Sequence, residues 1–401
     1  MTTGRRWAPA RIAGAAVVML ALWASAAPTL VYPLYISAWH LSTLETTVVF
    51  AAYPAAMILS LLVLGNLSDI AGGRRAMLVG LALLAVGALG LVVAPGLGVL
   101  AAGRALMGLG VGASLGAATV EAGRSSGEAG GHGGTVVTVA TAVGLITALV
   151  LGGAAVQVWP QPLHLPFAVL LVAILWVAVL VWRTPDDRPA AAARWRLQPL
   201  VIPRPRRSFA AGVLAVSAAY CLGAVYLGVG AQYARDVVGS TDAIVTGLVL
   251  ATSAVAIGGS AIAARGSRPR SALVGGALAV ACGQTLMIAS GDVHQLWMLL
   301  VSSAIGGAGY GLLFSAGITV VIAAGPAHHR AAATSAAYLI AYAMQAASAL
   351  AVGAISTTAN LRVGLTAGSA AVLVIVVAAV LLHAGPRRGA AVAVVPGAGL
   401  G

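Results

Sequence analysis

The chain has 401 residues, of which 60% are hydrophobic and 8% are charged, and its formal net charge at pH 7 is +13. Soluble domains carry about a quarter charged residues, so this composition excludes a soluble globular protein and indicates a membrane protein. Cys221 and Cys282 both lie within apolar runs, which excludes a disulfide framework or a metal-binding spacing and predicts two small core residues.

The first apolar segment, residues 5–39, has two possible interpretations. Its basic start and the A-x-A-like sequence at Ala24–Ala26 are typical of a cleaved secretory signal. However, the apolar character continues through "TLVYPLYISAW" (29–39), which makes the segment long enough to span a bilayer. We therefore expect an uncleaved first transmembrane helix.

Apolar runs of roughly 20 residues, the length that a helix needs to cross the hydrocarbon core, recur along the chain. Twelve transmembrane helices are predicted, over residues 12–38, 46–64, 76–94, 99–121, 135–157, 164–182, 209–232, 243–264, 272–290, 295–324, 331–356 and 362–384. The fold class expected is therefore an all-α membrane protein with two pseudo-symmetric six-helix halves.

The halves are predicted as residues 1–182 and 209–401, the second ending in a short cytoplasmic tail. The segment 183–208 between them is rich in Pro and Arg, which suits a cytoplasmic linker. Two sequence repeats support the division: "RRAMLVGLAL" (74–83) matches "PRSALVGGAL" (269–278), and "MGLGVGASLGAATV" (107–120) echoes "GGAGYGLLFSAGITV" (306–320). Duplicated halves are typical of transporters that bind substrate between them.

The positions of the arginines test this topology. With a cytoplasmic N-terminus, nineteen of the 22 arginines fall on the cytoplasmic side, Arg235 and Arg362 fall outside, and Arg104 lies within a span. The positive-inside rule predicts this distribution. Topology therefore accounts for the basic charge without a nucleic-acid partner, and the protein is expected in the plasma or inner membrane with both termini in the cytoplasm.

Charged residues interrupt the apolar sequence at "GNLSDIAGGRR" (65–75), between the second and third spans. Asp69 is expected near the C-terminal end of a helix, where the helix dipole disfavours an anion, so Arg74 or Arg75 should compensate it. The segment is interpreted as a charged gating latch between helix ends. The small residues that its close contacts and tight turn would need are Gly65, Gly72 and Gly73.

This segment resembles the loop motif of the major facilitator superfamily, G-x-L-x-D-x-x-G followed by basic residues. The matching positions are Gly65, Leu67, Asp69, Gly72 and Arg74. The sequence departs from the motif at Ile70 and Gly73, and the second half has Ala264 where Asp69 would fall. In the superfamily an acid at the end of span four often joins this latch, which implies that role for Glu121 rather than a substrate contact.

Two further segments resemble motifs of the same superfamily. "RALMGLGVG" (104–112) resembles the span-four pattern, through Arg104, Gly108 and Gly110. "GLITALVLGG" (144–153) resembles the span-five antiporter motif and keeps Gly144, Gly152 and Gly153, which we expect at helix-packing positions. Ala148 and Leu149 replace the usual Gly-Pro there, which weakens the inference of antiport.

Arg104 and Glu45 each allow a functional and a structural interpretation. A charge within a span needs partners, so Arg104 either couples to substrate or protons, or caps backbone carbonyls as a structural hydrogen-bonding hub. Glu45 could accept protons on the outer side, but "STLE" (42–45) is a capping-box pattern with Ser42 as the N-cap. The histidines have no metal-binding spacing, and no metal or cofactor is expected.

Glycine motifs within the spans resemble catalytic signatures without their context. "GASLG" (112–116) and "GLGVGA" (108–113) fit nucleophile-elbow and dinucleotide patterns, which need a strand–turn–helix setting. We interpret Gly108, Gly112 and Gly116 instead as a helix-packing face. The protein is therefore not expected to be an enzyme, and an intramembrane enzyme is a remote alternative.

Superfamily members line their central cavity with spans 1, 4, 7 and 10. The candidates from those spans are Ser25, Thr29, Tyr32, Arg104, Tyr220, Tyr226, Tyr310 and Ser315. Polar tips on apolar walls suit a small amphipathic organic solute, neutral or anionic because Arg104 would repel cations. Pro28, Pro33 and the glycines at 306–311 are places where spans 1 and 10 could bend.

The leading hypothesis is a monomeric secondary transporter that works by alternating access. Resemblance to drug- and metabolite-efflux members implies proton-coupled export, with the proton gradient as the energy source. The alternative is an uncoupled facilitator or an importer of a small metabolite. The expected partners are the small-molecule substrate and the lipid bilayer.

Overall fold

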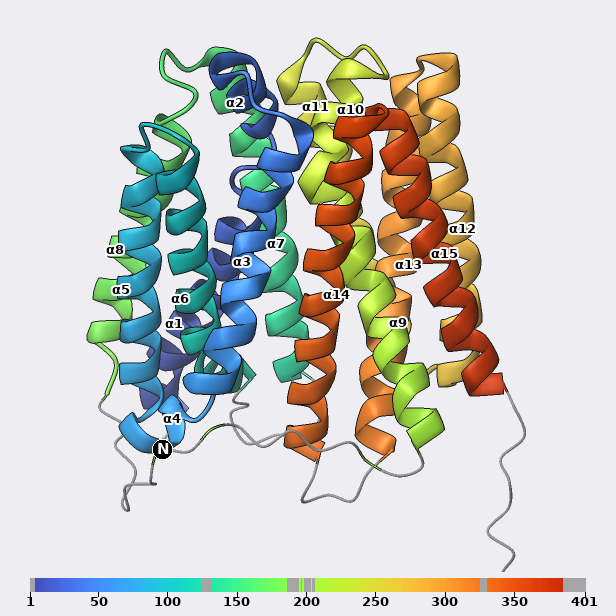
Figure 1. The fold of residues 1–401 in the computed structure, drawn as a ribbon. Helices are drawn as coiled ribbons and strands as arrows, with labels where there is room; N and C mark the ends of the chain where they lie inside the picture. Colours follow the sequence, from blue (N-terminus) through green and yellow to red (C-terminus); the bar gives the residue numbers. More distant parts are fainter. Residues whose placement is uncertain are drawn as a thin grey trace, which may run out of the picture.

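The computed structural model describes residues 4–123, 132–185, 195, 197, 203, 206–324 and 330–384, and those residues form a helical bundle (Figure 1). Within them, twelve helical segments are long and apolar enough to cross a membrane. They coincide with the twelve predicted spans, which confirms the fold class.

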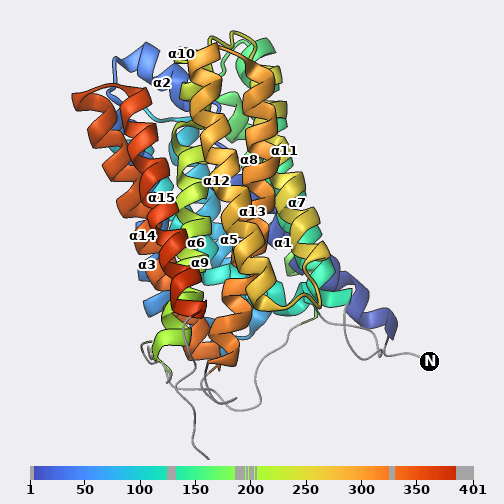
Figure 2. The same ribbon diagram turned by 90° about the vertical axis from the view of Figure 1, so that its right-hand side faces the viewer.

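The first half of the chain lies on one side of the bundle (Figure 1). Its helices are α1 (Gly4–Ala26), α2 (Tyr32–Trp39), α3 (Thr43–Val63), α4 (Leu67–Ala71), α5 (Gly73–Val92), α6 (Leu97–Gly123), α7 (His132–Val158) and α8 (Leu165–Trp182). The short helices α2 and α4 mark the two ends of the bundle, which we call the α2 face and the α4 face. The start of α1 leans away from the bundle at the α4 face (Figure 2).

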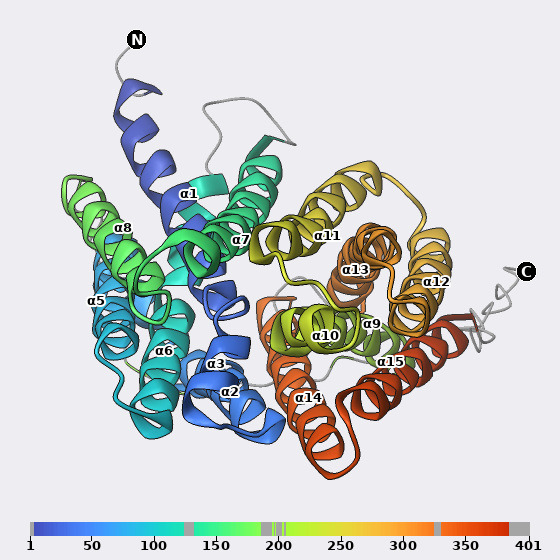
Figure 3. The same cartoon turned by 90° about the horizontal axis from the view of Figure 1, so that it is seen from above.

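The second half lies on the other side (Figure 3). Its helices are α9 (Arg206–Ala224), a π-helical turn η1 (Val225–Val229), α10 (Gly230–Asp236), α11 (Ala243–Ala263), α12 (Pro269–Val293), α13 (Leu296–Ala323), α14 (Arg330–Thr358) and α15 (Leu361–Ala384). The halves meet along two seams, where α3 packs on α14 and α7 packs on α11 (Figure 3).

The first span is broken, whereas the sequence predicted one helix over residues 12–38. Helix α1 ends at Ala26, a turn follows, and α2 begins at Tyr32 with Pro33 in its first turn. The break follows from Pro28, which has no backbone N–H to donate and clashes with a continuing helix on its N-terminal side. The bend expected at the prolines is thus present as a full interruption.

The seventh span is irregular in a way that its sequence did not indicate. It was predicted as a helix over 209–232, but the helix extends to Asp236 and contains the π-helical turn η1. Such turns insert one residue into a helix and occur often at functional sites. In contrast, α13 runs unbroken through Gly306–Gly311, where a bend had been considered.

Asp69 does not lie near the end of the second span, as the sequence analysis assumed. Helix α3 ends at Val63, and Asp69 lies in the first turn of the separate helix α4. The helix-dipole argument for a compensating arginine therefore does not apply, because an acid in a first turn is favourable. The turn between α4 and α5 uses Gly72 with φ of 90°, a conformation that favours glycine, whereas Gly73 begins α5.

The two halves repeat one packing solution between their third and fourth spans. A Cβ atom added to Gly110 of α6 would lie 2.5 Å from the carbonyl oxygen of Gly80 in α5. A Cβ atom added to Gly309 of α13 would lie 3.1 Å from the carbonyl oxygen of Gly276 in α12. Both helix pairs thus approach to backbone contact through glycine, as small-residue interfaces in membranes do.

The outer surface is apolar along the helices. Exposed side chains include Leu59, Trp176, Leu278 and Val374, which suits contact with lipid. Cys221 is buried as expected, but Cys282 is exposed, so its assignment as a core residue was wrong. Both cysteines lie in apolar helices, and hydrophobicity alone does not distinguish a lipid-facing position from a core position.

The capping box predicted at the start of the second span is confirmed. The Ser42 backbone amide donates to the Glu45 carboxylate at 2.7 Å, and the Glu45 amide donates to Ser42 Oγ at 3.2 Å. The Glu45 carboxylate thus satisfies the N-cap amide, and the Ser42 hydroxyl satisfies one of the first backbone donors of α3.

The glycines predicted as packing positions differ in their surroundings. A Cβ on Gly108, Gly112 or Gly144 would clash with α3 or α1, and one on Gly153 would clash with α11 of the other half. Gly116 has nothing within 4 Å, and Gly152 has only an ordinary contact with Leu30. The close face of α6 therefore ends at Gly112.

We predict that Gly108→Ala destabilises the protein, because its new methyl group would clash with the Tyr53 carbonyl oxygen. Overpacking of this kind costs about 1–3 kcal/mol. The matched change Gly116→Ala should leave the melting temperature unchanged or raise it slightly, since alanine favours the helix. Thermal melts of the two purified variants in detergent give the comparison, and equal melting temperatures would contradict the packing assignment.

Candidate functional site

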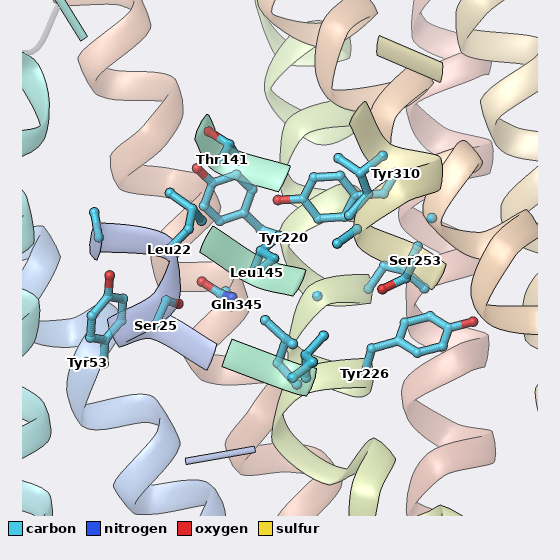
Figure 4. Close-up of a pocket in the computed structure, with 18 of the residues that line it drawn as sticks. Leu22, Ser25, Tyr53, Thr141, Leu145, Tyr220, Tyr226, Ser253, Tyr310 and Gln345 are labelled. Atoms are coloured by element: carbon cyan, nitrogen blue, oxygen red, sulfur yellow. The ribbon is translucent and has the colours of Figure 1, made fainter. Parts of the chain in front are cut away.

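A cavity lies between the two halves, midway along the helices (Figure 4). The space in it that is free of protein atoms, counted together with its opening to solvent, is about 950 Å³. Its walls come from α1, α3, α6 and α7 of the first half and from α9, η1, α11, α13 and α14 of the second. All of the side chains that line it are uncharged.

The wall from the first half is mainly aliphatic. Leu22, Val111, Leu115, Leu145 and Leu149 line it. The polar groups on this side are Ser25, Tyr53 and Thr141. Such a surface offers few hydrogen bonds and favours apolar contact.

The wall from the second half is aromatic. Tyr220, Tyr310 and Tyr342 line the cavity, and Phe314 and Tyr338 extend the cluster behind them. Tyr220 lies 6.4 Å from Tyr310 with an interplanar angle of 23°, and its ring meets Tyr342 edge-on at 4.8 Å. These are favourable geometries for aromatic pairs, so the rings stabilise one another.

Tyr226 lies in the irregular turn η1 and lines the cavity. Its hydroxyl contacts the Ser302 hydroxyl at 2.8 Å and the Ser302 carbonyl oxygen at 3.0 Å. The Tyr226 hydroxyl points away from the other side chains of the cavity wall (Figure 4). These two contacts tie η1 to α13.

Some of the predicted cavity residues line the cavity and others do not. Ser25, Tyr220, Tyr226 and Tyr310 are part of the wall. Three others lie outside it: Thr29 and Tyr32 are buried near the break in the first span, and Ser315 is half-buried on α13.

The wall also contains residues that the sequence analysis missed, because it considered only spans 1, 4, 7 and 10. They are Tyr53, Thr141, Ser253, Tyr342 and Gln345. A helical-face signal was present for α14, where residues 338, 342 and 345 follow i, i+4, i+7 spacing within an otherwise small-residue sequence.

Arg104 is fully buried and lies behind the cavity wall. Its Nη1 donates to the Ala24 carbonyl oxygen at 2.9 Å and its Nη2 donates to the Ser25 carbonyl oxygen at 3.2 Å. In a continuous helix the Ala24 carbonyl would accept from residue 28, which is Pro28 and has no N–H. Arg104 thus replaces the donor that the proline removes.

The Arg104 guanidinium also contacts the second span. Its central carbon lies 4.6 Å from the centroid of the Tyr53 ring, a cation–π arrangement. Tyr53 lines the cavity, so the ring separates the charge from the cavity space. The buried Tyr32 hydroxyl lies close enough to interact electrostatically with Arg104. These contacts match the interpretation of Arg104 as a structural hydrogen-bonding hub that caps backbone carbonyls.

The predicted latch residues lie together at the α4 face. Asp69 and Arg75 are exposed and Arg74 is half-buried. Among the described residues, no salt bridge joins Asp69 to Arg74 or Arg75. Glu121 is buried at the end of α6, where its Cβ packs against Gly14 of α1. Gly65 lies in the turn after α3.

Hydrogen bonds connect the two halves at the α2 face. Four link them there: Arg235 Nη1 to the Pro33 carbonyl oxygen (2.9 Å), Gln232 Nε2 to Thr43 Oγ1 (3.2 Å), the Leu44 amide to Thr357 Oγ1 (3.0 Å) and the Ala243 amide to Gln157 Oε1 (2.9 Å). At the α4 face, the part of the chain that the structure describes has one such link, from Arg265 to Thr135.

Comparison with known proteins shows the family to which this chain belongs. The sequence profile of the Major Facilitator Superfamily matches residues 12–268. The chain therefore belongs to this superfamily, and it is a membrane transporter rather than an enzyme. No curated protein matches the chain in sequence.

Solved structures with a similar fold include three transporters. The nucleoside transporter NupG has a TM-score of 0.72 and 11% identity, over 93% of this chain and 97% of that one. The peptide transporter POT has a TM-score of 0.73 and 16% identity, over 93% of both chains. A bacterial homologue of the human lysosomal transporter Spinster, in an inward-facing and unoccupied conformation, has a TM-score of 0.68 and 14% identity, over 94% and 95%. At these identities the likeness shows the fold.

We predict that Arg104→Leu lowers stability and that Pro28→Ala restores part of it. The single change leaves the buried Ala24 carbonyl oxygen without a donor, at about 1–3 kcal/mol, and also removes the donor of the partly buried Ser25 carbonyl oxygen. An alanine at position 28 would supply an N–H for the Ala24 carbonyl, so the double variant should melt at a higher temperature than Arg104→Leu alone. A double variant that melts with or below Arg104→Leu would contradict the capping role.

Proposed function

We propose that the protein moves a small, uncharged, amphipathic organic solute across the membrane by alternating access. The main observation in support of this proposal is the cavity, which lies between the two halves and has uncharged walls. A solute held there contacts both halves, so rocking of one half against the other exposes it to alternate sides. One chain encloses the whole cavity, which supports a monomer as the working unit.

The α4 face is proposed to be the cytoplasmic one. Arginines gather there: Arg74, Arg75, Arg183, Arg206, Arg207, Arg265, Arg268, Arg270 and Arg330. The α2 face has Arg235 and Arg362 among the described residues. The positive-inside rule supports this orientation in the cell membrane. The conformation with hydrogen bonds between the halves at the α2 face then corresponds to one that loads from the cytoplasm, as an exporter requires.

Proton-coupled export remains the leading proposal for energy and direction, through resemblance to efflux members of the superfamily. A specific observation favours the second candidate, an uncoupled facilitator. None of the described residues that line the cavity is a carboxylate or an imidazole. A proton carrier would then have to lie outside the cavity wall, and Arg104, the charged candidate in contact with that wall, is held by backbone carbonyls.

We further propose that the latch at the α4 face closes in the opposite conformation. Helix α4, which carries Asp69, contacts α5 and α6, which carry Arg74 and Glu121. The indole N–H of Trp195 in the linker between the halves donates to the Val63 carbonyl oxygen at 2.9 Å, just before α4. Linker, latch and second span thus meet at the end that would close.

Blocking the cavity should abolish transport. Gly223 lines it, and a Cβ atom there meets only ordinary contacts with Tyr310 and Gln345, so Gly223→Trp should fold and fill the space. The same substitution at Gly116, which has open space around it, is the matched control. The assay is flux of labelled amphipathic solutes in proteoliposomes, with a pH-sensitive dye inside.

Saturable flux that Gly223→Trp abolishes and Gly116→Trp preserves would support the proposal. Proton movement opposite to the solute would identify coupled export, and flux without it would identify a facilitator. Equal flux in wild type and Gly223→Trp would contradict the cavity as the transport site.

We predict that Asp69→Asn slows flux by about tenfold or more while the amount of folded protein stays normal, because one conformation loses its charged contacts. Asp292→Asn is the control, since Asp292 forms an exposed pair with Arg362 at the opposite face. Exposed pairs contribute at most about 1 kcal/mol, so this change should leave flux unaltered. Normal flux in Asp69→Asn would refute the gating role.

A further inference from the structure

A cluster of tyrosine and phenylalanine side chains lies beside the cavity. The chain has only nine tyrosines and four phenylalanines. Five of these thirteen form one cluster: Tyr220, Tyr310, Phe314, Tyr338 and Tyr342. All five come from the second half, on α9, α13 and α14. A bundle core made mainly of small and aliphatic residues does not need such a cluster for packing.

The cluster presents an ordered surface. Tyr220, Tyr310 and Phe314 lie within 23° to 31° of parallel, with centroids 6.2 to 6.4 Å apart. Figure 4 shows the Tyr220 and Tyr310 rings side by side, with their hydroxyls directed toward the opposite wall. Near-parallel rings of this kind offer stacking contact to a flat guest.

Hydrogen-bonding groups accompany the rings. Gln345 lines the cavity one turn from Tyr342, and its amide forms no hydrogen bond with the described residues. The same holds for the Tyr310 hydroxyl within that part of the chain. A guest with a carbonyl or N–H group can therefore satisfy them.

The charges argue against an ionic guest. An ion in a cavity with uncharged walls loses hydration without gaining a counter-charge. A cation could use the tyrosine rings, but Arg104 already occupies one face of the Tyr53 ring and places positive charge behind the wall. An anion cannot reach that charge directly, because the Tyr53 ring separates it from the cavity.

From these observations we propose that the substrate is a neutral, planar aromatic compound with at least one polar ring substituent, which stacks on the Tyr220–Tyr310 wall. This assignment rests on the proposed function of the cavity. The second half thus provides chemical selectivity, and the aliphatic first half provides a surface that fits many shapes.

The test uses four probes of similar size and the purified protein. Acridone is neutral and planar, N-methylacridinium carries a fixed positive charge, acridine-9-carboxylate is an anion, and dicyclohexyl ketone is neutral but not aromatic. Binding is measured by equilibrium dialysis. Acridone should bind at least about tenfold more tightly than each of the others, the gain expected of one or two good stacking contacts.

Variants of the wall separate ring contact from hydrogen bonding. Tyr220→Leu should weaken acridone binding by about tenfold, whereas Tyr220→Phe should retain it, because stacking needs the ring and not the hydroxyl. Leu278→Ala, on the exposed apolar surface of α12 and outside the cavity, is the control and should change the affinity by less than about threefold.

Several results would overturn the proposal. Tighter binding of N-methylacridinium would identify a cation cage, and tighter binding of the carboxylate would identify an anion site. Equal binding of dicyclohexyl ketone, an unaltered affinity in Tyr220→Leu, or no binding of acridone would each remove the aromatic selectivity. If any of these results were found, the transport function would still be supported by flux of a different solute, provided that Gly223→Trp blocks that flux. Conversely, Tyr220-dependent acridone binding without flux of any solute would refute the function and leave the binding site.

Discussion

The structure depends on how the chain accommodates a proline in its first span. Pro28 ends α1 and leaves the Ala24 carbonyl without its helical donor, in a part of the bundle where water cannot replace it. Arg104 supplies the missing donors and is itself fully buried. Because the same guanidinium contacts the Tyr53 ring, one side chain holds the first, second and fourth spans in register beside the cavity.

This arrangement explains why a charge in the bundle is compatible with an uncharged cavity. The Arg104 donors face backbone, and its flat face is covered by an aromatic ring that forms the wall. Arg104 therefore stabilises the cavity wall, although its charge does not contact the cavity. The second half contributes a different element, an aromatic cluster on α9, α13 and α14, and Tyr226 of the π-helical turn forms a hydrogen bond with α13.

Residue patterns predicted the number of spans, the sequence repeats and the capping box, because each depends on local spacing and hydrophobicity. The break after Ala26 was foreshadowed by Pro28, but the turn η1 was not, since no proline or other local residue signal marks it. The position of Asp69 was misjudged because hydrophobicity does not show where α3 stops and α4 begins.

The site could be predicted only in part for the same reason. Tyr220 and Tyr310 lie on spans where a resemblance directs attention, whereas Tyr53, Tyr342 and Gln345 reach the cavity through the tilt and rotation of neighbouring helices. Gly116 and Cys282 were predicted to pack inside the bundle but do not. The sequence of an apolar helix does not show which of its faces packs against other helices.

The central claim is that the two halves rock about the cavity, and pulsed electron spin resonance distances test it most directly. One label pair would be placed at Ser37 and Thr241 of the α2 face, and another at Thr119 and Thr319, near the α4-face ends of α6 and α13, after removal of Cys221 and Cys282. With a transported solute in saturating amount, the account predicts two distances for each label pair. When the α2-face pair shifts towards its longer distance, the α4-face pair should shift towards its shorter distance. A single distance for each pair, unchanged by the solute in a protein that still transports it, would contradict alternating access.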